Sequence, residues 1–151
     1  MAKLAARFGT DLRLLPDLIY GNDREPGHDL STVRREITTQ FDLEMVNGVE
    51  NLQQALLMRF LTPMGELTAL GHPEYGSRLF ELIGEHNIET THNRAKLYVL
   101  LALSQEPRIK QVTSVQVTAS KEDRTRMDIK MTLVAIDEDT PLNLVFPFFL
   151  S

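Results

Sequence analysis

"VQVTASKEDRTRMDIKMTLVA", residues 115–135, decides the fold class of this chain. In the first part of this stretch, apolar Val115, Val117 and Ala119 alternate with polar residues. In the second part, the alternating apolar residues are Met127, Ile129, Met131, Leu133 and Ala135. A short polar connection, residues 121–125, separates the two parts. Period-two alternation on both sides of such a connection predicts an antiparallel β-hairpin with one buried face and one exposed face.

Two helices are expected before this hairpin. Residues 87–104 are apolar over most of a helical circumference, with Asn87 or Thr90 as candidate N-cap, which predicts a central helix. Residues 49–61 follow helical spacing and carry Glu50 in the first turn, where the helix dipole favours an acidic side chain. Thr62 and Pro63 are expected to end this earlier helix, because proline disfavours helical geometry at the residue before it.

The chain after the hairpin, "PLNLVFPFFLS" (residues 141–151), is almost wholly apolar. Leu142, Leu144 and Phe146 share one side of an extended strand, and Val145 lies on the other side. A strand that is apolar on both faces must be covered on both faces, and Pro147 suits an edge strand rather than a sheet centre. Two interpretations remain open: a last strand of the domain's own sheet, or a strand edge that pairs with another chain.

The remaining segments complete an α+β prediction. Residues 37–46 alternate as a strand with an irregularity near Gln40, Asn47 and Gly48 form a turn, and residues 21–29 are expected to form an exposed loop. Residues 65–89 contain many glycines and are expected to form an ordered loop with a short strand pair and a helical turn around residues 78–83. We therefore expect an extension over residues 1–36. Residues 37–151 are expected to form one domain, with two main helices packed on a mainly antiparallel sheet. This sheet is expected to end in a hairpin plus a terminal strand.

Composition limits the possible functions. The 151 residues carry a net charge of −5 with scattered basic residues, which argues against nucleic acid or an anionic membrane surface as a partner. The chain has no cysteine, which excludes thiol catalysis, disulfides and zinc–thiolate sites. The first residues do not resemble a signal peptide, and no stretch has the length and apolar character of a membrane span.

Catalytic and metal sites receive little support from the sequence. A glycosidase needs two carboxylates facing a cleft, and the candidates here are Glu66, Glu74, Glu81 and Glu85. Carboxylates at such spacings occur in almost any acidic chain, so a structural use is favoured. The histidines have no metal-binding spacing; they are His28, His72, His86 and His92. No nucleotide-binding motif is present, so we predict a protein without enzymatic activity, cofactor or metal.

The junction between the second helix and the hairpin carries the sequence Glu106-Pro107-Arg108. Pro107 removes a backbone donor and disfavours helical geometry at Glu106, which stiffens the turn. Glu106 offers a pair of acceptors and Arg108 a planar fork of donors. The pair could close on itself as an intramolecular brace, or it could face outward as a site for another protein. The residues alone do not decide between these interpretations.

Several ordered motifs resemble one known family. They are "MVNGVENLQQALLMRFLTPMGEL", "GHPEYGSRLFELIG", "NRAKLYVLLALSQEPRI" and the alternating strands that follow. Over residues 42–134 the chain resembles the baseplate wedge proteins that initiate the sheath in contractile phage tails, tailocins and extracellular injection systems, also called lysozyme-like. The most specific motifs are the P-x-Y-G-S element at Pro73–Ser77 and the E-P-R triplet.

This resemblance implies a function in assembly. The family's E-P-R triplet contacts the helical bundle of the wedge heterodimer around the tail-tube hub, which here implies Glu106, Pro107 and Arg108. Its sheet-end strands receive the first sheath subunits, which implies the hairpin and the strand with Leu142, Leu144 and Phe146. The expected location is the baseplate of a virion or injection particle assembled in the bacterial cytoplasm. A peptidoglycan glycosidase and a regulatory binding module are the alternatives.

Overall fold

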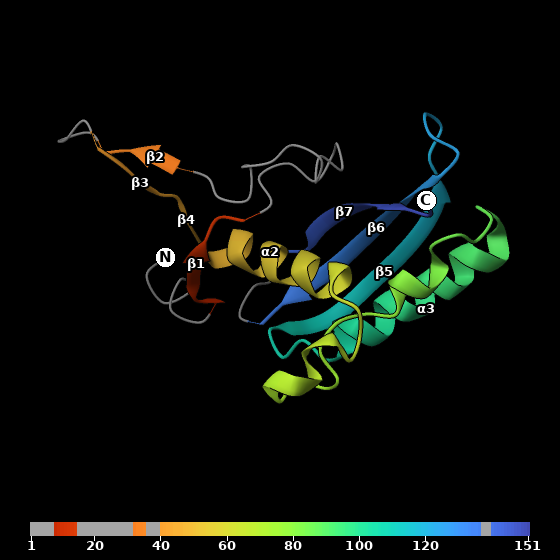
Figure 1. Ribbon diagram of the computed structural model, residues 1–151, viewed down its shortest axis with the longest axis horizontal. Coiled ribbons are helices and arrows are strands. Elements are labelled where there is room, and N and C mark those ends of the chain that lie inside the picture. The colour runs from red at the N-terminus through yellow and green to blue at the C-terminus, as the bar shows by residue number, and fades with distance from the viewer. Residues whose placement is uncertain (1–7, 15–31, 36–39, 137–139) are drawn as a thin grey trace. The chain divides into compact units, whose positions relative to one another are not determined.

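The computed structural model describes residues 8–14, 32–35, 40–136 and 140–151. The chain divides into two compact units, Met1–Ala55 and Leu56–Ser151, and each is described by itself. The fold is α+β, as the sequence predicts, with two α-helices and antiparallel sheets in the described residues (Figure 1). The division falls inside helix α2 (Gly48–Leu61). The boundary expected near residue 36 remains a prediction, and the loop expected at residues 21–29 lies outside the described residues.

The second unit is built on a three-stranded antiparallel sheet. Its strands are β5 (Ile109–Ala119), β6 (Arg126–Ala135) and β7 (Leu142–Phe149), in the spatial order β5-β6-β7. The predicted hairpin is confirmed, and the first strand begins six residues before Val115. The apolar tail forms β7, an edge strand in the described residues, which agrees with Pro147 in that strand.

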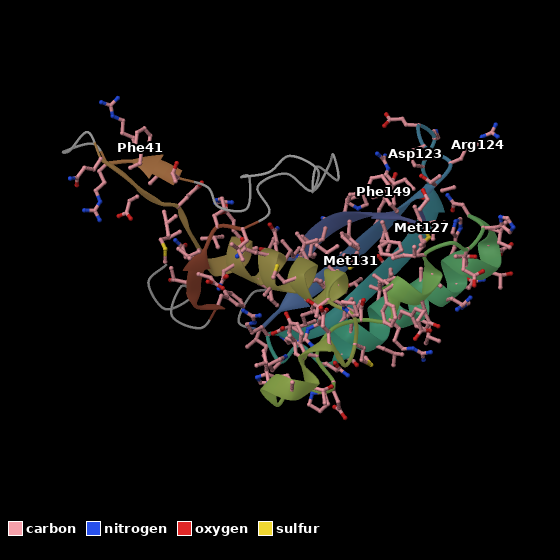
Figure 2. All side chains as sticks on the ribbon, viewed as in Figure 1. Phe41, Asp123, Arg124, Met127, Met131 and Phe149 are labelled. Atoms are coloured by element: carbon pink, nitrogen blue, oxygen red, sulfur yellow. The ribbon has the colours of Figure 1, made fainter. Side chains whose placement is uncertain are left out.

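One face of this sheet forms the core of the unit. Alternate residues of β6 are buried, among them Met127 and Met131, which Figure 2 labels. Phe146 of β7 lies opposite Ile129 and packs against Phe60, with 5.5 Å between the ring centroids. Helix α3 (Glu89–Ser104) runs beside β5 and contributes buried apolar side chains to the unit (Figure 1). The period-two pattern of the sequence therefore matches the burial of β6.

Helix α3 begins differently from the prediction. Its N-cap is Ile88, which has no capping side chain, so neither Asn87 nor Thr90 caps the helix. The Asn87 side-chain amide instead donates to the carbonyl oxygens of Arg124 and Arg126, at 2.9 and 3.0 Å. Asn87 therefore ties the start of α3 to the β5–β6 connection, because these carbonyls offer acceptors within reach.

The segment between α2 and α3 contains two short 3₁₀ helices, η1 (Glu66–Leu70) and η2 (Leu79–Leu82). The helical turn expected at residues 78–83 is confirmed as η2. The short strand pair is reduced to one parallel bridge between Pro63 and Ser77. Gly76 has φ +109°, and a Cβ there would lie 2.5 Å from the carbonyl oxygen of Thr62. Close passage of two backbone segments therefore requires glycine at this position.

The first unit contains two small antiparallel sheets. Strand β1 (Thr10–Leu12) pairs with β4 (Met45–Asn47), and β2 (Thr32–Arg34) pairs with β3 (Phe41–Leu43). The strand expected at residues 37–46 is therefore two strands with different partners, and its first three residues lie outside the described part. Asn47 and Gly48 form no separate turn, because Asn47 ends β4 and Gly48 begins α2. Helix α2 ends at Leu61, before Thr62 and Pro63, as predicted.

Candidate docking site

The E-P-R triplet forms the tight connection between α3 and β5. The Glu106 amide donates to the Leu103 carbonyl at 3.1 Å, and the Ile109 amide donates to the Glu106 carbonyl at 3.1 Å. Pro107 lies between them, is exposed and needs no backbone donor there. Two successive turns thus reverse the chain, so that Glu106 faces inward, Pro107 outward, and Arg108 lies at the start of the sheet.

Glu106 is buried, with 5% of its surface exposed, and it is paired within the unit. Its Oε1 accepts hydrogen bonds from Arg108 Nε at 2.6 Å and from the Arg108 amide at 3.3 Å. Its Oε2 lies 3.5 Å from Arg59 Nη2, in the last turn of α2. The carboxylate therefore lies between two guanidinium groups, and the geometry contains the intramolecular brace. Partner binding by the triplet remains a prediction.

Arg59 is the member of this cluster that the sequence analysis missed. Its side chain is 11% exposed, lies 4.5 Å above the centre of the Tyr75 ring, and donates to Gln105 Oε1 at 3.5 Å. Because Tyr75 belongs to the P-x-Y-G-S element, the two most specific motifs of the sequence meet at Arg59. One signal was available: Arg59 follows Leu52 and Leu56 at helical spacing, so a basic residue lies on the apolar face of α2.

The surroundings of Glu106 favour its charged form. Burial alone would raise the pKa of Glu106, but the Arg108 side chain, the Arg108 amide and the Arg59 charge together hold it below its ordinary value. The carboxylate is therefore ionised at neutral pH and holds Arg108 in place. The side chain of Arg108 itself is 27% exposed.

The second candidate site is the border of the sheet. Within the described residues, β5 and β7 each pair only with β6. The β7–β6 register is unbroken over eight residues, whereas β5 shows two register shifts, between Ile109 and Gln111 and between Val112 and Ser114. Bulges of this kind disrupt the ladder and twist an edge away. The β7 edge is thus the more regular template for an added strand.

The three predicted contact residues of β7 point inward. Leu142, Leu144 and Phe146 lie opposite inward-facing residues of β6, and Phe146 is buried against Phe60. On the other side of the strand, Val145 is 61% exposed. A partner that approaches β7 would therefore meet its backbone edge and Val145 rather than the three predicted side chains. Partner binding by Leu142, Leu144 and Phe146 remains a prediction.

The carboxylates proposed for a glycosidase are used in other ways. Glu81 accepts two hydrogen bonds from Arg78, at 2.7 and 2.9 Å, and one from the Tyr98 hydroxyl at 3.1 Å. The bond from Arg78, followed by that from Tyr98, lowers the pKa of Glu81. A general acid requires the opposite shift. Glu85 pairs with Arg94 at 3.1 Å, and Glu66 and Glu74 are exposed. This arrangement ties η2 to α3 and does not resemble an acid–nucleophile pair.

The described part of the chain lacks two further features. No three acidic or histidine side chains there lie close enough to hold a metal ion, and His28 falls outside that part. No helix in the same residues is long and apolar enough to cross a membrane.

Comparison with known proteins identifies the class. A family model described as contractile injection system sheath initiator matches residues 28–138. The chain belongs to the sheath initiator family of contractile injection systems, and its role is that of a structural component. A crystal structure from Geobacter sulfurreducens, assigned provisionally as a tail lysozyme, is 24% identical with a TM-score of 0.59. The match covers 68% of this chain and 91% of that chain, and at this identity it supports the fold alone. Comparison with curated proteins gives no match.

Proposed function

We propose that this protein is a non-enzymatic part of the baseplate that starts the sheath by offering the β7 edge to a strand of the first sheath subunit. The observation that carries the proposal is a regular antiparallel strand with no second strand partner among the described residues. An unpaired row of backbone donors and acceptors is a template for strand addition. Membership of the sheath initiator family supports a sheath protein as the partner.

The usable part of the edge is limited to residues 142–146. Pro147 has no backbone N–H, so an added strand would lose a possible hydrogen bond there. Val145 lies on this part of β7 and is exposed, so it can pack against a side chain of the incoming strand. A short, regular edge with one exposed apolar side chain fits the addition of a single strand.

The E-P-R junction is the proposed attachment to the baseplate wedge core. Glu106 fixes the Arg108 guanidinium by a 2.6 Å hydrogen bond, while Pro107 is exposed at the apex of the turn. Because Arg108 is held in place before binding, docking loses little side-chain entropy. The partners would be the wedge heterodimer and the sheath protein, close to the tube and hub. The particle would be assembled in the bacterial cytoplasm.

The β7 proposal is tested with Val145→Lys, because an edge lysine opposes strand addition. We expect normal folding, since Val145 is exposed, and particles whose baseplates carry no extended sheath. Val145→Thr is the matched control, because it keeps the β-branched shape without a charge. Electron micrographs of assembled particles give the measurement. Extended sheaths of ordinary length on Val145→Lys particles would contradict the proposal.

The junction is tested with Arg108→Gln, with Arg124→Gln as the control because Arg124 is an exposed arginine on the β5–β6 connection. We expect Arg108→Gln to prevent incorporation into the wedge while the purified protein keeps its circular dichroism spectrum. Co-purification with wedge components measures incorporation. Normal incorporation of the variant would show that Arg108 serves only to brace Glu106.

A further inference from the structure

A different binding surface lies in the first unit, at the beginning of α2. Asn51 and Gln54 are buried, and their side-chain amides bind the main chain of residues 8–14. Asn51 Nδ2 donates to the Phe8 carbonyl at 2.7 Å, Gln54 Nε2 donates to the Leu12 carbonyl at 2.8 Å, and Gln54 Oε1 accepts from the Leu14 amide at 2.8 Å. These contacts are made to the backbone of the segment that contains β1 and not to its side chains.

Two further contacts depend on the sequence of the segment. The Phe8 side chain is buried, and Arg13 bridges two carboxylates, with its Nε 2.7 Å from Glu44 Oε1 and its Nη2 2.7 Å from Glu50 Oε2. The charges of receptor and segment are therefore complementary, because Glu44 and Glu50 of the receptor both pair with Arg13 of the segment. Three pairs between β1 and β4 complete the attachment.

We propose that this surface is a receptor for a peptide with a short central strand and that its second occupant is residues 8–14 of another copy of this chain. The receptor consists of β4, Glu44, Glu50, Asn51 and Gln54. Its ligand is a segment in which the apolar anchor Phe8 lies two residues before the strand Thr10–Leu12, and Arg13 follows the strand directly. Exchange of this segment between neighbouring copies links them without any new interface.

The chain length between segment and receptor permits this exchange. Twenty-nine residues separate Leu14 from Glu44, the first residue of the receptor. An extended chain of only the 17 residues before Thr32 would already span up to roughly 60 Å. An exchanged segment makes the same contacts as the chain's own segment, which is the physical basis of domain swapping. The chain's own segment competes at an effective concentration in the millimolar range, so exchange grows when copies are crowded together.

The absence of cysteine from the chain allows a direct test with the full-length protein. Thr10 and Asn47 are exposed and lie opposite each other in the β1–β4 register. Opposed residues of paired antiparallel strands have Cα atoms about 4.5–5.5 Å apart, which is within the range that a disulfide spans. Thr10→Cys chains are mixed with Asn47→Cys chains under mild oxidation, and the mixed dimer is quantified by mass. The control mixture replaces Asn47→Cys with Asn93→Cys, an exposed position on α3.

We expect the Thr10→Cys and Asn47→Cys mixture to cross-link at least roughly tenfold faster than the control, because docking raises the local concentration of the two thiols. Adding Arg13→Glu to the Thr10→Cys chain should reduce the rate to that of the control, since the new charge meets Glu44 and Glu50. A chain carrying both cysteines reports whether β1 docks at all. An internal disulfide in that chain with no mixed dimer above control would overturn the proposal, and so would the absence of both products.

Discussion

Neutralising Glu106 gives the sharpest test of how the E-P-R junction is stabilised. Glu106→Gln keeps the volume of the side chain and one acceptor but removes the charge between Arg59 and Arg108. The hydrogen bond from Arg108 Nε, 2.6 Å long, loses its ionic character, and such charge-assisted bonds are roughly twice as strong as neutral ones. Arg59, which is largely buried, loses the charge that its guanidinium faces.

The expected loss of stability is about 2–3 kcal/mol. A hydrogen bond to a charged group contributes about 1.5–3 kcal/mol, and glutamine retains part of it. Removing one partner of a fully buried ion pair costs about 3–5 kcal/mol, but Arg108 is partly hydrated and the Arg59 contact is long, at 3.5 Å. For a chain of this size the loss corresponds to a fall in Tm of roughly 5–10 °C.

Urea unfolding followed by circular dichroism measures the free energy of unfolding at neutral pH. Glu122→Gln is the control, because Glu122 is 84% exposed and its contact with Arg126, at 3.7 Å, is expected to contribute less than about 0.5 kcal/mol. The double variant Glu106→Gln with Arg59→Met should recover at least about 1 kcal/mol relative to the sum of the single variants. If Glu106→Gln lowered the unfolding free energy no more than Glu122→Gln does, the brace would not stabilise the fold. The same would follow if the effects of Glu106→Gln and Arg59→Met on the unfolding free energy were additive.

Three other predictions concern acid, backbone approach and catalysis. Because the folded-state pKa of Glu106 is lowered, its contribution is complete above the unfolded value of about 4.3 and is lost as pH falls through the folded value. Glu106→Gln should therefore flatten the unfolding free energy in this acidic range. Gly76→Ala should cost at least about 2 kcal/mol more in urea unfolding than Gly71→Ala, because a Cβ at Gly71 meets no atom within 4 Å. A peptidoglycan zymogram should show no clearing, and clearing that Glu81→Gln abolishes would restore the glycosidase hypothesis.

The sequence predicts those parts of the fold in which apolar residues recur with a single period, that of a strand or that of a helix. Alternation over residues 127–135 predicts β6 and its buried face, and the apolar run with Thr62 and Pro63 at its end predicts α2. The N-cap of α3 could not be predicted, because Asn87 binds carbonyls at residues 124 and 126, far away in sequence. The split of the strand at residues 41–47 also depends on two partners that local pattern does not contain.

The candidate site, too, could be predicted only where its residues are adjacent in the sequence. Glu106, Pro107 and Arg108 form a continuous motif, so the sequence indicates them. The sequence does not indicate that Glu106 pairs with Arg59, because the two residues are far apart in the chain. Because Glu106 is buried, reversing its charge would test folding rather than partner binding. The test of partner binding is therefore made at Arg108. For β7, alternation indicates which side chains share a face, whereas only the sheet order shows which edge is open.

The difference between the two borders of the sheet has a consequence for the free protein. If both borders were regular, β7 of one molecule could pair with β5 of the next. Such a head-to-tail contact need not close into a ring. Repeated contacts of that kind produce filaments. The two register shifts in β5 make its edge a poor template for strand pairing. They therefore protect the free protein from forming such polymers before assembly.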